Sequence, residues 1–143
     1  MFQLHPQLEA DTVLVGRFPL SLLLLSKDAN YPWCILVPQR AAMEEIYQLD
    51  RLDQQQLLEE SSLLAKTLVE LFAADKINLA TIGNMVPQLH MHHIARFKTD
   101  AAWPRPVWGA VDAVTYQEDM LAQRVERIAT SLKPHGLTID QVC

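Results

Sequence analysis

The apolar residues change period after Pro38, and this change restricts the fold more than any other feature of the sequence. Three short runs of apolar residues come first, at 12–17, 20–26 and 33–37. Proline, aspartate and asparagine separate the runs, and such short connections favour antiparallel strands. Beyond Pro38 the spacing becomes helical, with a short helix predicted at 41–48 and a long one from Asp53.

The long helix is expected to pack one face on a sheet. Asp53 is a suitable N-cap, and Gln56 three residues later can complete a capping box. The apolar side chains then form one stripe, made of Leu57, Leu58, Leu64, Leu68, Leu71 and Phe72. Charged side chains are expected to point away from the sheet, namely Glu59, Glu60, Lys66 and Glu70.

The second half returns to strands before a last helix. Strands are predicted at 77–82 and 88–97, a Pro- and Trp-bearing loop at 101–109, and a helix at 116–132. The order strands, helices, strands, helix predicts an α+β fold: an antiparallel sheet of about five strands with helices packed on one face. We expect a single domain over 1–143, with its core at about 10–97 and a C-terminal loop and helix at 98–143.

Composition excludes several classes of function. The formal net charge of −5 argues against broad neutralisation of nucleic-acid phosphates, although one site can still be locally positive for a small anion. The most apolar stretch, Leu20 to Leu25, is too short to span a bilayer, and the N-terminus lacks the features of a signal peptide. Cys34 and Cys143 form no metal spacing and no evident disulfide framework, so a cytoplasmic protein is expected.

Three of the five histidines lie within four positions, at His90, His92 and His93. Alternation along a strand places Gln88, His90 and His92 on one face, and Leu89, Met91 and His93 on the other. Two imidazoles and an amide on one face can act at a phosphorus centre, where one ring attacks and its neighbours position oxygens or protonate a leaving group.

Other interpretations of these histidines remain open. A His-rich strand is often structural or a surface feature, and a bare H-x-H-H motif is weak. A zinc site using His90, His92 and His93 needs a further ligand, for which only scattered residues such as His5 and His135 are available. Two neighbours favour an anion site: Gly83-Asn84 can present donors to phosphate, and Arg96 can bind an anion or a structural carboxylate.

The segment from Gly83 to Arg96 resembles the signature of the histidine-triad (HIT) family. The stretch from Trp33 to Arg40 resembles another strand of that family, which ends in a Val-Ile-Pro-Lys-like turn, so the likeness covers about 10–97. Val86-Pro87 and Arg96 set the register: Gln88 matches the first histidine of the triad, His90 the second and His92 the third. In this register His93 falls on an apolar position, and Ala95 stands where many members have proline.

The resemblance implies hydrolysis or transfer at the α-phosphate of a nucleotide through a covalent nucleotidyl-histidine intermediate, without a metal or cofactor. His90 would be the nucleophile, His92 would bind phosphate oxygens or the leaving group, and Gln88 would orient its neighbours. Nucleotide contacts would come from Asn84, Arg96 and either Asp28 or Asn30. The most similar branch comprises bacterial proteins like diadenosine tetraphosphate hydrolase, and many family members are homodimers that join two sheets edge to edge.

Several of these residues have more than one possible role. Gln88 cannot carry a proton as imidazole does, so a nucleotide-binding module with little or no catalysis is the main alternative, followed by a His-rich zinc-binding protein. Leu22 and Leu24 can line an adenine pocket or belong to the core. Trp103 and Trp108 can cover the cleft or a partner subunit, or fasten their loop to its own domain. The expected partner is a small nucleotide, with neither nucleic acid nor a membrane.

Overall fold

The chain folds around one five-stranded antiparallel sheet, seen in a computed structural model that describes residues 1–139. The elements are α1 Pro6–Asp11, β1 Thr12–Arg17, β2 Ser21–Ser26, β3 Trp33–Pro38, the 3-10 turn η1 Ile46–Gln48, α2 Arg51–Phe72, β4 Lys76–Ala80, β5 Met91–Arg96, α3 Met120–Leu132 and η2 Lys133–His135. The strand order is β1-β2-β3-β5-β4, so β5 lies between β3 and the edge strand β4. The predicted α+β class is confirmed. Cys143 lies outside the described residues.

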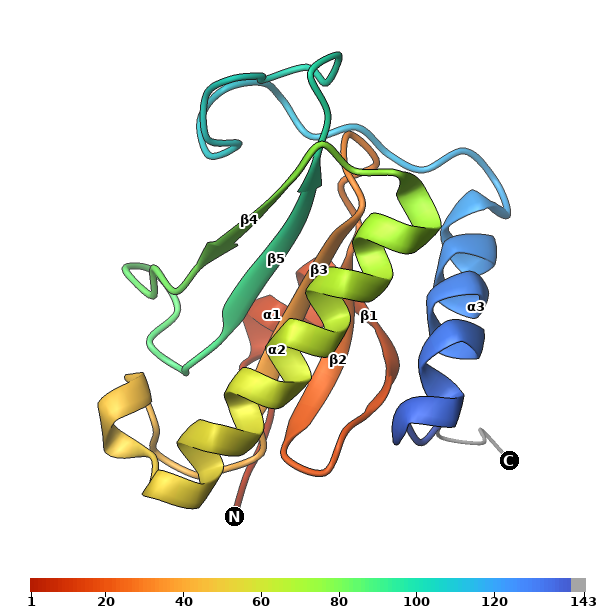
Figure 1. Cartoon of the computed structure of the whole chain (residues 1–143). Helices are drawn as coiled ribbons and strands as arrows, with labels where there is room; N and C mark the ends of the chain where they lie inside the picture. The colour runs from red at the N-terminus through yellow and green to blue at the C-terminus, as the bar shows by residue number, and fades with distance from the viewer. Residues whose placement is uncertain (140–143) are drawn as a thin grey trace.

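Helices α2 and α3 cover one face of the sheet and form the main core with it (Figure 1). Leu23 and Leu25 of β2 point into this core, whereas Leu22 and Leu24 point to the opposite face. There they pack with Leu8 of α1, so both leucines belong to a second core under the N-terminal segment. Helix α1 was not predicted from the sequence, although Pro6 in its first turn marks its start.

The long helix begins earlier than predicted. Its N-cap is Asp50, whose side chain accepts a hydrogen bond from the Asp53 N–H at 2.8 Å. Asp53 instead pairs with Arg40 through its carboxylate, at 2.7 Å from Arg40 Nε. The predicted helix at 41–48 is reduced to η1 at its end, and α3 begins at Met120 rather than at residue 116.

The prediction that Glu60 points away from the sheet was wrong. Its side chain is buried, and its two oxygens accept hydrogen bonds from the backbone N–H groups of Leu20 at 2.9 Å and Ser21 at 3.0 Å. Gln56 donates a third bond to Glu60 at 2.8 Å. The carboxylate therefore satisfies backbone donors at the start of β2, a role that periodicity along the helix does not reveal. No helix within residues 1–139 is long and apolar enough to cross a bilayer.

Candidate active site

A cavity of about 780 Å³ lies on the face of the sheet opposite α2. His90, which directly precedes β5, and His92 on β5 line it, and each is only 7% exposed. Four other segments complete its walls: helix α1, the turn after β2, the turn at 82–86 and the loop that carries Trp108. Of the nucleotide contacts expected from the sequence, Asn84 and Asp28 line this cavity.

His90 has one ring nitrogen committed to the backbone. Its Nδ1 lies 2.7 Å from the carbonyl oxygen of Gln88. Because a carbonyl only accepts hydrogen bonds, Nδ1 must carry a proton in this contact. In the neutral ring the lone pair is therefore on Nε2, which is the nitrogen left for a ligand in the cavity.

His92 and His90 form an edge-to-face pair, with ring centroids 4.9 Å apart. Trp33 donates from its indole Nε1 to His92 Nδ1 at 3.0 Å, and Trp108 packs against the same imidazole at 5.0 Å between centroids. Burial lowers the pKa of His92 to about 4, and the neighbouring His90 and His93 add to this effect. His92 is therefore neutral at physiological pH.

His93 points to the opposite face, as strand alternation predicted. Its Nε2 lies 2.7 Å from the hydroxyl of Ser61 on α2, and its Nδ1 lies 3.0 Å from the carbonyl oxygen of Met91. The side chain is fully buried, and burial lowers its pKa to about 4, although the Met91 carbonyl opposes the shift. His93 thus joins β5 to α2 and does not reach the cavity of His90 and His92.

The buried histidines should make the fold sensitive to acid. Between pH 6.5 and about 4 the unfolded chain binds protons that folded His92 and His93 do not, so the free energy of unfolding falls as pH falls. His93 alone should contribute roughly 3 kcal/mol to this loss. Urea denaturation at pH 7, 5.5 and 4.5 measures it, and His93→Asn should give a shallower dependence. Parallel curves for the two proteins would contradict this assignment.

Gln88 lies outside the cavity and binds the N-terminal segment. Its Oε1 accepts a hydrogen bond from the His5 N–H, and its Nε2 donates to the carbonyl oxygen of Gln3, both at 2.9 Å. Contact with His90 comes only from the Gln88 backbone carbonyl. The side chain therefore fixes the chain terminus against the strand that carries the histidines.

Asp28 and Asn30 form the turn between β2 and β3, and only Asp28 reaches the cavity. Asp28 Oδ1 accepts from the backbone and side-chain amides of Asn30, at 3.0 and 2.9 Å. Asn30 Nδ2 also donates to the Asp112 carbonyl oxygen at 2.9 Å, and Val114 N–H donates to Asp28 at 3.2 Å. The pair fastens the loop that carries Trp108 to the turn.

Arg96 is buried away from the cavity and is fully engaged within the protein. Its guanidinium donates to the Asp100 carboxylate at 2.8 and 3.1 Å and to Asn78 Oδ1 at 2.8 Å. The rings of Tyr31 and Trp103 lie 5.6 and 5.7 Å from it. Of the two roles open to Arg96, the structure shows the contact with a structural carboxylate.

The two tryptophans of the C-terminal loop have different surroundings. Trp103 packs on Arg96, whereas Trp108 lines the cavity beside His92 and Trp33. Trp33 was not among the site residues predicted from the sequence. The one available signal was its place in a strand that resembles part of the family signature, because its contact with His92 joins residues 59 apart.

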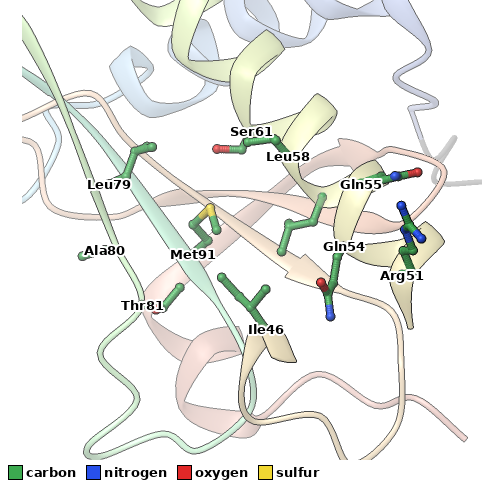
Figure 2. Close-up of a pocket in the computed structure, with 11 residues that line it drawn as sticks. Ile46, Arg51, Gln54, Gln55, Leu58, Ser61, Leu79, Ala80, Thr81 and Met91 are labelled. Atoms are coloured by element: carbon green, nitrogen blue, oxygen red, sulfur yellow. The ribbon is translucent and has the colours of Figure 1, made fainter. Parts of the chain in front are cut away.

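A second cavity, of about 610 Å³, lies on the helix side of the sheet between α2 and β4. Figure 2 shows Leu58 and Ser61 of α2 on one side and Leu79 of β4 on the other, with Met91 between them. Neither His90 nor His92 lines it. Within residues 1–139, no group of three or more His, Cys, Asp or Glu side chains is arranged to hold a metal ion.

Comparison with known proteins assigns the family. The HIT domain model matches residues 7–99. A histidine triad protein from Marinobacter aquaeolei VT8 is 48% identical, with a TM-score of 0.90 and coverage of 94% of this chain and 98% of that one. A histidine triad protein from Bradyrhizobium japonicum is 44% identical, with a TM-score of 0.88 and coverage of 90% of this chain and 96% of that one. One from Sinorhizobium meliloti 1021 is 41% identical, with a TM-score of 0.88 and coverage of 91% and 96%.

No curated protein matches the chain. Proteins with this domain generally bind nucleotides and include hydrolases and transferases. The domain model covers well over half of the chain, and all three structures resemble it over nearly their full length. The chain therefore belongs to the histidine triad (HIT) family.

Proposed function

We propose that this protein hydrolyses or transfers a nucleotide at its α-phosphate, with His90 as the nucleophile. The observation that carries the proposal is the contact between His90 Nδ1 and the Gln88 carbonyl at 2.7 Å. It leaves the Nε2 lone pair of a buried imidazole as the nucleophilic atom at the cavity. The cavity of about 780 Å³ is in the size range of small-ligand sites.

The proposed reaction has two steps. His90 Nε2 forms a bond to the α-phosphorus while the bond from phosphorus to the leaving oxygen or nitrogen breaks. His92, next to His90, hydrogen-bonds a phosphate oxygen or the leaving group. Water or another acceptor then attacks phosphorus and releases His90. Asn84 and Asp28 line the same cavity, where we assign them to the phosphates and to the ribose or base.

Dinucleoside polyphosphates and nucleoside phosphoramidates are the substrates to test first. We expect the protein to release a nucleoside monophosphate from at least one of them. Rapid quenching followed by mass spectrometry of peptides should find a nucleotidyl group on His90. If product forms without any adduct on His90, even in single-turnover samples, the covalent mechanism is wrong.

A nucleotide-binding module with little or no catalysis is the second candidate, and Gln88 is the observation that favours it. Gln88 has no ring nitrogen to exchange protons, and its amide is occupied by Gln3 and His5. This alternative predicts a higher melting temperature with nucleotide but no product. A zinc site formed by His90, His92 and His93 is opposed by the burial of His93 against Ser61 on the other face.

The partner that this site suits is a small nucleotide. We assign it no nucleic-acid or membrane partner, because the formal net charge of −5 disfavours binding to extended phosphate surfaces. We also propose a cytoplasmic location, which the buried free thiol of Cys34 supports.

We further propose that two copies of the chain pair through β4. This strand is at the edge of the sheet. Its Leu79 is 54% exposed and lines the second cavity, which Figure 2 shows. Light scattering should therefore give twice the 16.2 kDa mass of the chain. Leu79→Lys should shift the protein toward monomer, because it places charge on the joined surface. Val111→Lys, at an exposed residue of the C-terminal loop, is the control. A monomeric wild-type protein would refute this pairing.

A further inference from the structure

A hydrogen bond joins Trp33 to His92, the second imidazole in the cavity, and bears on which ring nitrogen of His92 carries the proton. The two residues lie on neighbouring strands, where Trp33 is opposite Ile94 and therefore diagonal to His92. Diagonal neighbours on one face of a sheet are within reach of large aromatic side chains. The indole Nε1 lies 3.0 Å from His92 Nδ1.

The direction of this bond is fixed by chemistry. An indole N–H only donates, so His92 Nδ1 must accept with its lone pair. A neutral His92 then carries its single ring proton on Nε2. In a protonated His92, Nδ1 would also carry a hydrogen, and two N–H donors would then face each other. The contact with Trp33 therefore also disfavours the charged ring.

The neighbouring histidine has the opposite arrangement. His90 carries its proton on Nδ1, held by the Gln88 carbonyl, and its lone pair is on Nε2. His92 carries its proton on Nε2. The two rings, 4.9 Å apart, therefore differ at the same kind of atom: one Nε2 has a lone pair and the other has a proton to donate.

Trp33 is itself held in place by aromatic neighbours. Its ring meets those of Trp108 at 5.6 Å and Tyr31 at 6.3 Å, both edge to face. Indole does not titrate in the physiological range, so its hydrogen bond to His92 keeps one direction throughout. Trp108 touches the same imidazole, at 5.0 Å, but only through its ring.

We propose that Trp33 is a positioning residue that holds His92 in the Nε2–H form, as a hydrogen-bond donor to the phosphate or leaving group. The inference rests on the proposed function for its catalytic consequence. The tautomer itself can be measured without any substrate. Trp33→Phe removes the donor and keeps a smaller aromatic ring at this position, and Trp108→Phe makes the same change in ring size beside the same imidazole.

The first measurement uses the unmodified full-length chain labelled with ¹⁵N. We expect a scalar coupling across the hydrogen bond from the Trp33 indole nitrogen to His92 Nδ1, and histidine ring correlations that place the His92 proton on Nε2. A His92 proton on Nδ1 would overturn the proposal. This test does not depend on the folding of any variant.

The second measurement compares Trp33→Phe with Trp108→Phe. In Trp33→Phe the His92 ring should lose its single tautomer, and kcat should fall about tenfold with KM changed less than about threefold. In Trp108→Phe the His92 tautomer should stay as in the wild type. Unchanged ring signals and kcat in Trp33→Phe would refute the positioning role.

The two proposals fail in different ways. A wild-type chain with the expected coupling but no turnover would refute the proposed reaction and leave the Trp33–His92 assignment standing. Turnover through His90 with His92 protonated on Nδ1 would refute the Trp33–His92 assignment and leave the proposed reaction standing.

Discussion

His90→Ala is expected to abolish turnover, with kcat at least about 10⁴-fold below that of the wild type. The substitution removes the only atom that we assign to attack phosphorus, and the other cavity residues can still bind nucleotide. Nucleotide affinity should therefore change much less than kcat. Product formation in a quenched assay and nucleotide binding by calorimetry measure the two effects separately, and the adduct should be absent from the variant.

Gln88→Ala is the matched control for this experiment. It keeps the backbone carbonyl that orients His90 and removes only the amide that binds Gln3 and His5. We expect less than about a tenfold loss of kcat, together with greater proteolytic sensitivity of the N-terminal segment. An equal loss in both variants would mean that the Gln88 side chain acts in the chemistry. Activity of His90→Ala within tenfold of wild type would refute His90 as nucleophile.

The orientation of the histidines could be predicted because it depends on a local rule. Side chains alternate along any strand, so one apolar neighbour, Met91, was enough to place His93 on the helix side and His92 on the other. The α+β class was predictable for the same reason, since strand and helix periods are visible within short windows of sequence.

Contacts between distant segments could not be predicted in this way. Gln88 binds residues 83 and 85 positions away, and Trp33 binds His92 across 59 positions. Glu60 is an acidic residue of an amphipathic helix, so it was expected to face solvent. It is instead buried against the start of β2, 40 residues away. In each case a polar side chain satisfies a partner that only the folded sheet brings near.

Arg96 shows the same limit at a single residue. Its position at the end of the signature was compatible with an anion or with a structural carboxylate, and both use the same guanidinium donors. Which of the two binds Arg96 depends on Asp100, which lies four residues later in the chain and is buried together with Arg96. Their side chains are 2% and 3% exposed.

Arg96→Met should destabilise the fold by about 4 kcal/mol, because it leaves Asp100 buried without its partner. Burial alone would raise the pKa of Asp100, but hydrogen bonds from Arg96 and from the Phe97 and Trp103 N–H groups lower it to about 2. The wild-type pair therefore contributes its full stability above about pH 4, and the contribution is lost as pH falls toward 2. Urea denaturation at pH 7 measures the change.

Arg40→Met is the control, because Arg40 makes the same two-pronged contact with Asp53 at the surface. Solvent screens that pair, so its loss should cost less than about 1 kcal/mol. Without Arg96 the pKa of Asp100 should rise, because only the backbone N–H groups of Phe97 and Trp103 then oppose the effect of burial. The deficit of Arg96→Met should therefore shrink as pH falls and the carboxyl takes up a proton. Adding Asp100→Asn should recover part of the lost stability, since it removes the buried charge and keeps an acceptor oxygen for the backbone N–H groups that bind Asp100. Equal losses in Arg96→Met and Arg40→Met would show that burial of the Arg96 pair has no energetic consequence.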